Sequence, residues 1–152
     1  MPTAESLAAQ YIRGKGSRPT TEEYSAFCDW CNLKFLRIKH LVDFTEQEVS
    51  PELMHTHWGL WGRLLVSTAH NEHPFWLPFM NAQFRAVHDW DHLQYGCGYD
   101  LDGEVSAFVA ASESAPESIR WILYSEIVLQ AAAMIHTGQF QRQKLIRIGG
   151  EG

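Results

Sequence analysis

Apolar and polar residues follow a helical period over most of the chain. Helices are predicted over residues 4–13, 20–35, 51–70, 81–95, 103–114 and 116–137. Proline or a capping residue opens several of them, and glycine closes others. The stretch 33–43 fits a helix or a strand, because its residues partly alternate in character. The expected fold is therefore all-α: one helical bundle over residues 1–152, with a short strand or extended segment near 33–43.

The helix predicted over 81–95 carries a pair of histidines. At about 100° per residue, His88 and His92 lie about 40° apart on one face, which lets two imidazoles reach one ion. Ala86, Trp90 and Leu93 cluster on the opposite face, which should pack into the core. The histidine face is then expected to meet solvent or a polar cavity.

Three acidic residues near this pair are candidate ligands. Asp89 and Asp91 flank the histidines almost symmetrically, so either could bind an ion or accept a hydrogen bond that fixes an imidazole tautomer. Glu104 follows the glycine-rich turn GCGYDLDG, which permits a sharp chain reversal back towards the histidines. Two histidines and one carboxylate form a ligand set that suits Zn²⁺, Fe²⁺ or Mn²⁺.

Glu126 is an isolated acid in a helix that is apolar nearly all round. A buried carboxylate without a partner is costly, so we expect Glu126 to contact a metal, a histidine or an arginine. Gln130, one turn later, lies on the same stripe. Glu126 and Asp89 are also the candidate general bases of the site.

Composition narrows the classes of function. The chain has 152 residues, 45% of them hydrophobic, which is typical of one globular domain. A net charge of −6 disfavours nucleic-acid binding. No apolar run long enough for a membrane span and no secretory leader is evident, so a cytoplasmic location is expected. Cys28 and Cys31 form a C-x-x-C on a predicted helix, interpreted as two half-buried thiols.

The sequence His88-Asp89-x-x-His92, followed by eleven residues and Glu104, resembles the HDxxH-x11-E signature of a ubiquinone-biosynthesis family. Those proteins are regarded as scaffolds of the coenzyme Q synthesis complex. The resemblance covers about twenty residues. It implies an all-α fold with a polyprenyl-lipid groove, and a divalent ion, usually zinc, held by the two histidines, the aspartate and the glutamate. It also implies a role in oxidative decarboxylation of the quinone headgroup precursor.

A second resemblance reaches further along the chain. The block Asn81-x-x-Phe84-Arg85-x-Val87-His88-Asp89, a later Gly-Glu pair, and Glu126 followed four residues on by Gln130 are similar to uncharacterised bacterial and phage proteins. That family implies a site that includes Glu126, but it implies no activity.

Three hypotheses follow. The first is a metalloenzyme acting on an apolar, quinone-like or isoprenoid-like small molecule. The second is a non-enzymatic protein that binds a lipid or small ligand through a metal, and the third is a metal-free acid–histidine network. Zinc is the first expectation for the ion, with iron and magnesium as alternatives, and a homo-oligomer is compatible with all three. The expected metal ligands are His88, Asp89, His92, Glu104 and Glu126.

Overall fold

The computed structural model describes residues 2–147. Helices make up most of it, in chain order α1 (Ala4–Arg13), α2 (Thr21–Ile38), α3 (Pro51–Trp61), α4 (Pro78–Tyr95), α5 (Leu101–Ser114), α6 (Arg120–Leu123) and α7 (Gln130–Thr137). Short 3-10 turns cover Lys39–Leu41 and Glu117–Ile119, and a π-helical segment covers Tyr124–Leu129. Two strands, β1 (Val42–Thr45) and β2 (Leu64–Ser67), complete the fold. The predicted all-α class with a short strand is confirmed.

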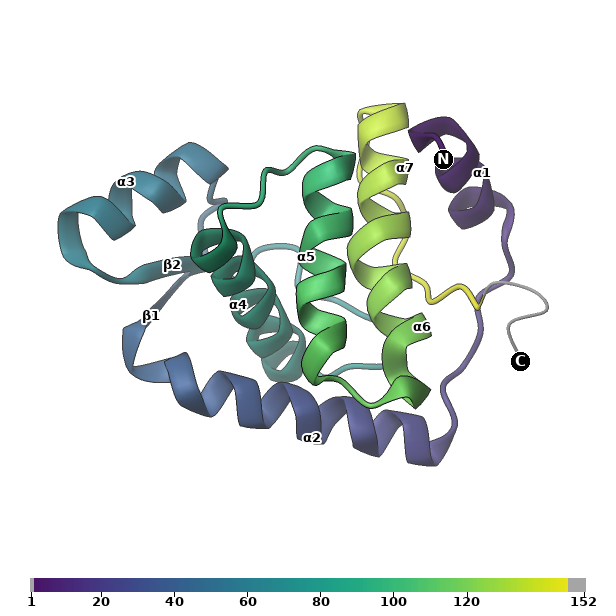
Figure 1. Ribbon diagram of the computed structural model, residues 1–152, viewed down its shortest axis with the longest axis horizontal. Coiled ribbons are helices and arrows are strands. Elements are labelled where there is room, and N and C mark those ends of the chain that lie inside the picture. The colour runs from purple at the N-terminus through teal and green to yellow at the C-terminus, as the bar shows by residue number, and fades with distance from the viewer. Residues whose placement is uncertain (1, 148–152) are drawn as a thin grey trace.

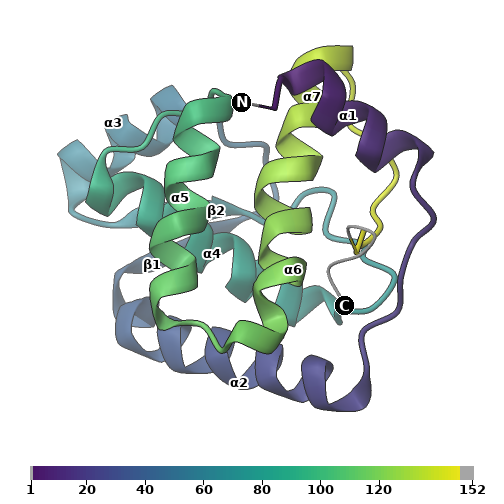
Figure 2. The ribbon, with the colours of Figure 1, turned by 45° about the vertical axis from the view of Figure 1, so that its right-hand side comes forward.

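The helices form a bundle crossed by α2 (Figure 1). α4, α5 and the helix that runs from α6 into α7 stand above α2, while α1 lies against α7 in both ribbon views (Figures 1 and 2). The core between them is rich in aromatic rings. Phe27 of α2, for example, stacks on Trp76 with ring centroids 4.3 Å apart and also contacts Phe84 of α4. These rings pack α4 against α2.

The strands pair in parallel, with Val42 opposite Leu64, and α3 connects them. The helix predicted over 51–70 is therefore shorter than expected. It ends at Trp61 because Gly62 adopts the left-handed conformation (φ 64°), after which Leu64 and Val66 point into the core as strand residues. In the ambiguous stretch 33–43, helix continues to Ile38, and extended backbone begins only at Val42.

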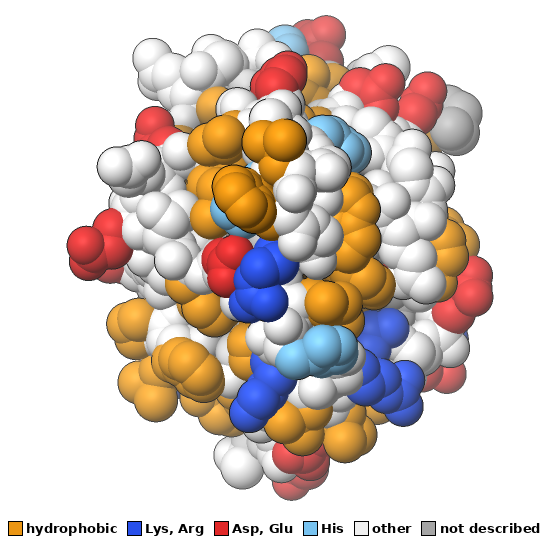
Figure 3. Space-filling model, turned by 90° about the vertical axis from the view of Figure 1, so that its left-hand side faces the viewer, with side chains coloured by type: hydrophobic (Ala, Val, Ile, Leu, Met, Phe, Trp, Pro, Cys, Tyr) orange, Lys and Arg blue, Asp and Glu red, His pale blue; other side chains and the backbone are white. Residues whose placement is uncertain are grey.

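The end of the molecule that carries α3 and the strands exposes several apolar side chains among charged ones and histidines (Figure 3). Leu60 and Trp61 are the most exposed of those on α3, at 69% and 68%.

The helical segment Glu117–Thr137 is long and apolar enough, by length and composition alone, to cross a membrane. Half of its most apolar window is buried inside the structure, where it packs against α1 and α5. Its middle widens into the π-helical segment that contains Ser125 and Glu126. The chain after α7 returns along the bundle, where Ile146 donates its backbone N–H to the Ser125 hydroxyl at 2.9 Å.

Candidate metal centre

α4 places His88 and His92 one turn apart near its C-terminal end. Pro78 occupies the first turn of this helix, and Gly96 ends it in the left-handed conformation (φ 66°). Ala86 and Val87 are buried, as expected for the apolar face. His92 is buried completely as well, so the histidine face meets α5 in a closed polar cluster and not open solvent.

The turn between α4 and α5 delivers Glu104 to this face. The Asp100 side chain caps α5 by accepting the Gly103 N–H at 2.8 Å. A β-carbon at Gly103 would collide with the carbonyl oxygen of Gly98, so glycine is required where the turn passes over the helix start. Glu104 follows at once, in the first turn of α5, and is buried.

Three donor atoms converge at this point. The Nε2 atoms of His88 and His92 are 3.1 Å apart, and the Oε1 atom of Glu104 lies 3.1 Å from the first and 2.9 Å from the second. Ligand atoms about 2.1 Å from one ion lie about 3.0 Å apart at right angles and about 3.4 Å apart at tetrahedral angles. The triangle therefore has the size of one face of a metal coordination shell.

The backbone fixes the proton of His92. Its Nδ1 lies 3.0 Å from the Cys97 carbonyl oxygen, which can only accept, so Nδ1 carries the hydrogen. In neutral His92 the Nε2 lone pair then points at the Glu104 carboxylate. Two lone pairs facing each other at 2.9 Å repel, unless a positive charge is shared between them. That charge is either a proton on His92 or a metal ion.

The pKa values of Glu104 and His92 also favour a positive charge between these two groups. Burial alone would raise the pKa of Glu104, but hydrogen bonds and charge from His88 and His92 outweigh it and lower that pKa to about 2. Burial alone would lower the pKa of His92, but Glu104 and the Cys97 carbonyl raise it overall. The carboxylate is thus held in its charged form, and the pocket favours a cation beside it.

Aromatic rings hold the two imidazoles in place. Tyr99, in the turn before α5, stacks on His92 with centroids 3.9 Å apart and planes 6° apart. Phe84, one turn before His88 on α4, lies nearly parallel to it at 6.3 Å. The Nδ1 atom of His88 is buried and has no hydrogen-bond partner in the part of the chain that the structure describes.

Among residues 2–147, His88, His92 and Glu104 are the group of histidine and acidic side chains that could hold a metal ion. Asp89 lies beside the group but outside it. Burial raises the pKa of Asp89, while the nearby charges of His88, His92 and Arg85 lower it. Its side chain borders a surface cavity of about 550 Å³ that Arg85 also lines.

Asp91 points the other way, towards α2. It is buried, it shares a smaller cavity with Lys34, Arg37 and Trp90, and the Lys34 charge partly offsets the pKa increase caused by burial. Of the two aspartates that the sequence left undecided, Asp89 is therefore the one that borders the larger surface cavity, which His88, His92 and Glu104 do not line.

Glu126 forms a separate pair. Its Oε1 lies 3.1 Å from the Nε2 atom of His73, and both side chains are almost completely buried. The Nδ1 atom of His73 accepts the backbone N–H groups of Phe75 and Trp76, so the His73 proton sits on Nε2 and is donated to Glu126. The expected partner of the lone acid is thus a histidine. Glu126 does not belong to the three-residue group on α4 and α5.

Gln130 has a buried amide nitrogen without a partner among the described residues. Cys28 and Cys31 lie on α2, and burial raises the pKa of both thiols, to about 12 for Cys31. Cys28 is half-buried on the helix face, as expected, whereas Cys31 is completely buried.

Sequence reasoning did not find His73, Tyr99 or the Cys97 carbonyl. His73 precedes Pro74 in an irregular loop, where no periodicity relates it to Glu126. Tyr99 and Cys97 lie inside the glycine-rich turn, whose path decides what they contact.

Comparisons with protein-family models, curated proteins and solved structures found no match.

Proposed function

We propose that this protein binds one divalent metal ion through His88, His92 and Glu104 and uses it as an enzyme acting on a small molecule. The observation that carries the proposal is the convergence of three donor atoms at 2.9–3.1 Å while the Cys97 carbonyl directs the His92 lone pair into their centre. A metal ion satisfies all three donors at once. A proton satisfies one pair of them.

Zinc is the ion that this ligand set supports best. Two imidazole nitrogens and one carboxylate oxygen are ligands of catalytic zinc sites, and the same set also suits iron(II). Magnesium prefers oxygen ligands and retained water, so the two nitrogens weigh against it.

The number of protein ligands supports an enzyme over a structural site. Structural zinc sites are closed by four protein ligands, whereas three leave a position open for water or substrate. When bound, such an ion supplies Lewis-acid chemistry. Asp89 follows His88 in the chain and borders a surface cavity, and it is the side chain that we assign to proton transfer. Glu126 has no part in this assignment because it is bonded to His73.

The substrate class rests on the cavity and on the resemblance described above. Val49, Leu53 and Phe140 give the cavity beside Asp89 an apolar portion. Together with the likeness of the HDxxH-x11-E spacing to coenzyme Q proteins, this supports an apolar or quinone-like molecule.

One observation favours a second candidate function, a non-enzymatic protein whose metal holds a ligand or the fold. His92 is completely buried and the His88 side chain is only 17% exposed, so access to the ion is narrow. The coordination shell separates the candidates: water in the shell supports the enzyme, and a fourth protein ligand supports the alternative.

The proposal is tested by metal analysis of protein purified without added chelator and after reconstitution with zinc or iron(II). Wild-type protein is expected to hold one ion per chain, and His88→Ala and Glu104→Ala are expected to lose it. His55→Ala is the matched control, because His55 is an exposed histidine on α3. Variants that keep as much metal as the control, with circular dichroism confirming their fold, would contradict the assignment.

A further inference from the structure

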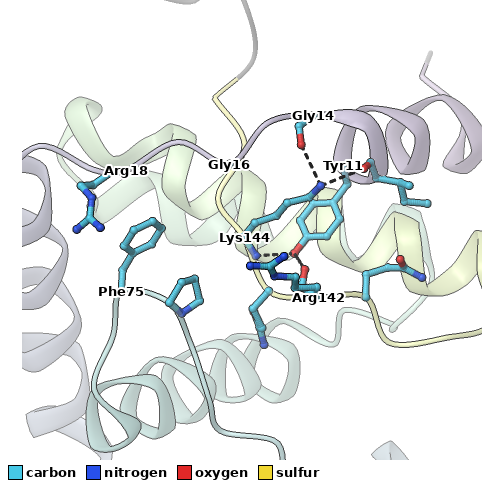
Figure 4. A pocket seen from close by; sticks show the side chains of 11 residues that line it. Tyr11, Gly14, Gly16, Arg18, Phe75, Arg142 and Lys144 are labelled. Atoms are coloured by element: carbon cyan, nitrogen blue, oxygen red, sulfur yellow. Dashed lines mark hydrogen bonds between the residues drawn. The ribbon is translucent and has the colours of Figure 1, made fainter.

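A third cavity lies where the two ends of the described chain meet. It has a volume of about 600 Å³, and its walls come from α1, the segment after α1, the loop before α4 and the segment after α7 (Figure 4). This volume is within the range of small-molecule sites, about 300–1,000 Å³.

The charged side chains that line this cavity are all positive. Arg18, Arg142 and Lys144 line it, and none of its lining residues within 2–147 is acidic. The chain as a whole carries a net charge of −6, so three cationic side chains around one cavity contrast with its overall negative charge. Neither Arg18 nor Arg142 forms an ion pair with a carboxylate in the described part of the chain.

Lys144 is held in place and retains a free donor. Its Nζ donates to the carbonyl oxygens of Ile12 and Gly14 at 3.0 and 2.9 Å, near the C-terminal end of α1. An ammonium group has three hydrogens, so one remains for a ligand.

The wall beside Lys144 is built in advance of any ligand. The Tyr11 hydroxyl donates to the Arg142 carbonyl oxygen at 3.2 Å and accepts the Lys144 backbone N–H at 3.1 Å. Burial raises the pKa of Tyr11 to about 12, so this hydroxyl keeps its proton at neutral pH. A fixed wall lowers the entropy lost on binding.

The cavity also offers apolar surface. Figure 4 shows Arg18 beside Phe75 on one side and Tyr11, Arg142 and Lys144 on the other. The Arg18 guanidinium lies 5.2 Å from the centre of the Phe75 ring, and Ile12 and Pro74 add apolar contacts. Planar guanidinium groups match the oxygens of phosphate and carboxylate groups, and the rings match an apolar body.

We propose that this cavity binds a small organic oxyanion, a phosphate or carboxylate carried on an apolar group, between Arg18, Arg142 and Lys144. The site is independent of the metal centre, because no residue of the metal cluster lines it. Its oxyanion is bound by the two arginines and the third donor of Lys144, and its apolar body lies against Phe75.

The test is calorimetric and NMR titration of the whole chain with phenyl phosphate, benzoate and phenol. Phenyl phosphate or benzoate is expected to bind saturably, and whichever binds more tightly identifies the group. The double variant R18Q/R142Q is expected to bind about tenfold more weakly or worse. Both arginines are exposed, so the fold should be retained.

Arg120→Gln is the matched control, because Arg120 is an exposed arginine on α6 away from this cavity. Binding by R120Q that equals the wild type, together with loss in R18Q/R142Q, supports the site. Phenol binding as tightly as the two anions, no saturable binding of either anion, or equal affinities in all variants would overturn it.

Discussion

Two buried histidines are oriented by backbone groups, and with opposite results. His92 donates its Nδ1 hydrogen to the Cys97 carbonyl, while His73 accepts backbone N–H groups at Nδ1. In their neutral forms, His92 therefore presents a lone pair at Nε2 and His73 presents an N–H at Nε2. An N–H matches the Glu126 carboxylate directly, whereas a lone pair facing Glu104 requires a cation between them.

The His73–Glu126 pair is predicted to stabilise the fold without contributing to metal binding. His73→Ala leaves a buried carboxylate without its donor, so the free energy of unfolding should fall by about 3–5 kcal/mol. Urea denaturation of the metal-free protein measures this loss.

In the double variant H73A/E126A, the loss should be smaller than the sum of the two single losses, because the pair acts as a unit. Metal content should remain at one ion per folded chain in H73A. Strict additivity, or loss of metal from folded H73A, would refute this separation of the two sites.

The sequence predicted the His88–His92 pair but not the His73–Glu126 pair. His88 and His92 are four residues apart on one helix, so helical geometry alone brought them together. Glu126 was recognised as needing a partner, but His73 lies 53 positions away in a loop, and only the folded chain brings it near.

At the scale of elements, the unit that builds the metal site is α4, the glycine turn and α5. Gly96 ends α4, Asp100 caps α5, and the close passage of Gly98 and Gly103 sets the angle between the two helices. Glu104 reaches the histidines because this turn is tight.

Gly103→Ala should therefore damage both the turn and the site. The added methyl group collides with the backbone of Gly98, which should cost about 1–3 kcal/mol of stability and weaken metal binding as Glu104 moves away. Calorimetric zinc titration and thermal unfolding measure the two effects.

Gly59→Ala on α3 is the control, since nothing lies near its added methyl group. It should raise stability by about 0.5–1 kcal/mol and leave metal affinity unchanged. Equal metal affinity in G103A and G59A would show that the turn does not position Glu104.

Element boundaries were harder to predict than element types. The pattern after Pro51 continued as a helix to residue 70, yet Gly62 breaks it, and the apolar residues that follow are buried as a strand. The π-helical segment around Glu126 leaves no trace in a period based on 3.6 residues.

At the scale of the whole molecule, the metal ligands come from two helices that must pack to form the site. Only the native state can offer all three donors, so a bound ion adds to the stability of the fold. The same packing also brings α1 beside the segment after α7, and the cationic cavity forms between them.

Removing the ion should thus lower the melting temperature. An ion present at about 100 times its Kd adds about 2.7 kcal/mol, which corresponds to a decrease of about 5–10 °C for a chain of this size. Glu104→Ala should melt at one temperature with or without chelator. A wild-type melting curve that does not change after verified metal removal would contradict the linkage.

The most direct test of the metal site is anomalous diffraction from crystals of the metal-loaded protein, recorded at the absorption edge of the bound element. One strong anomalous peak is expected about 2.0–2.2 Å from the Nε2 atoms of His88 and His92 and from a carboxylate oxygen of Glu104. A crystal of protein that carries one ion per chain, with its anomalous peak elsewhere, would contradict the proposed site.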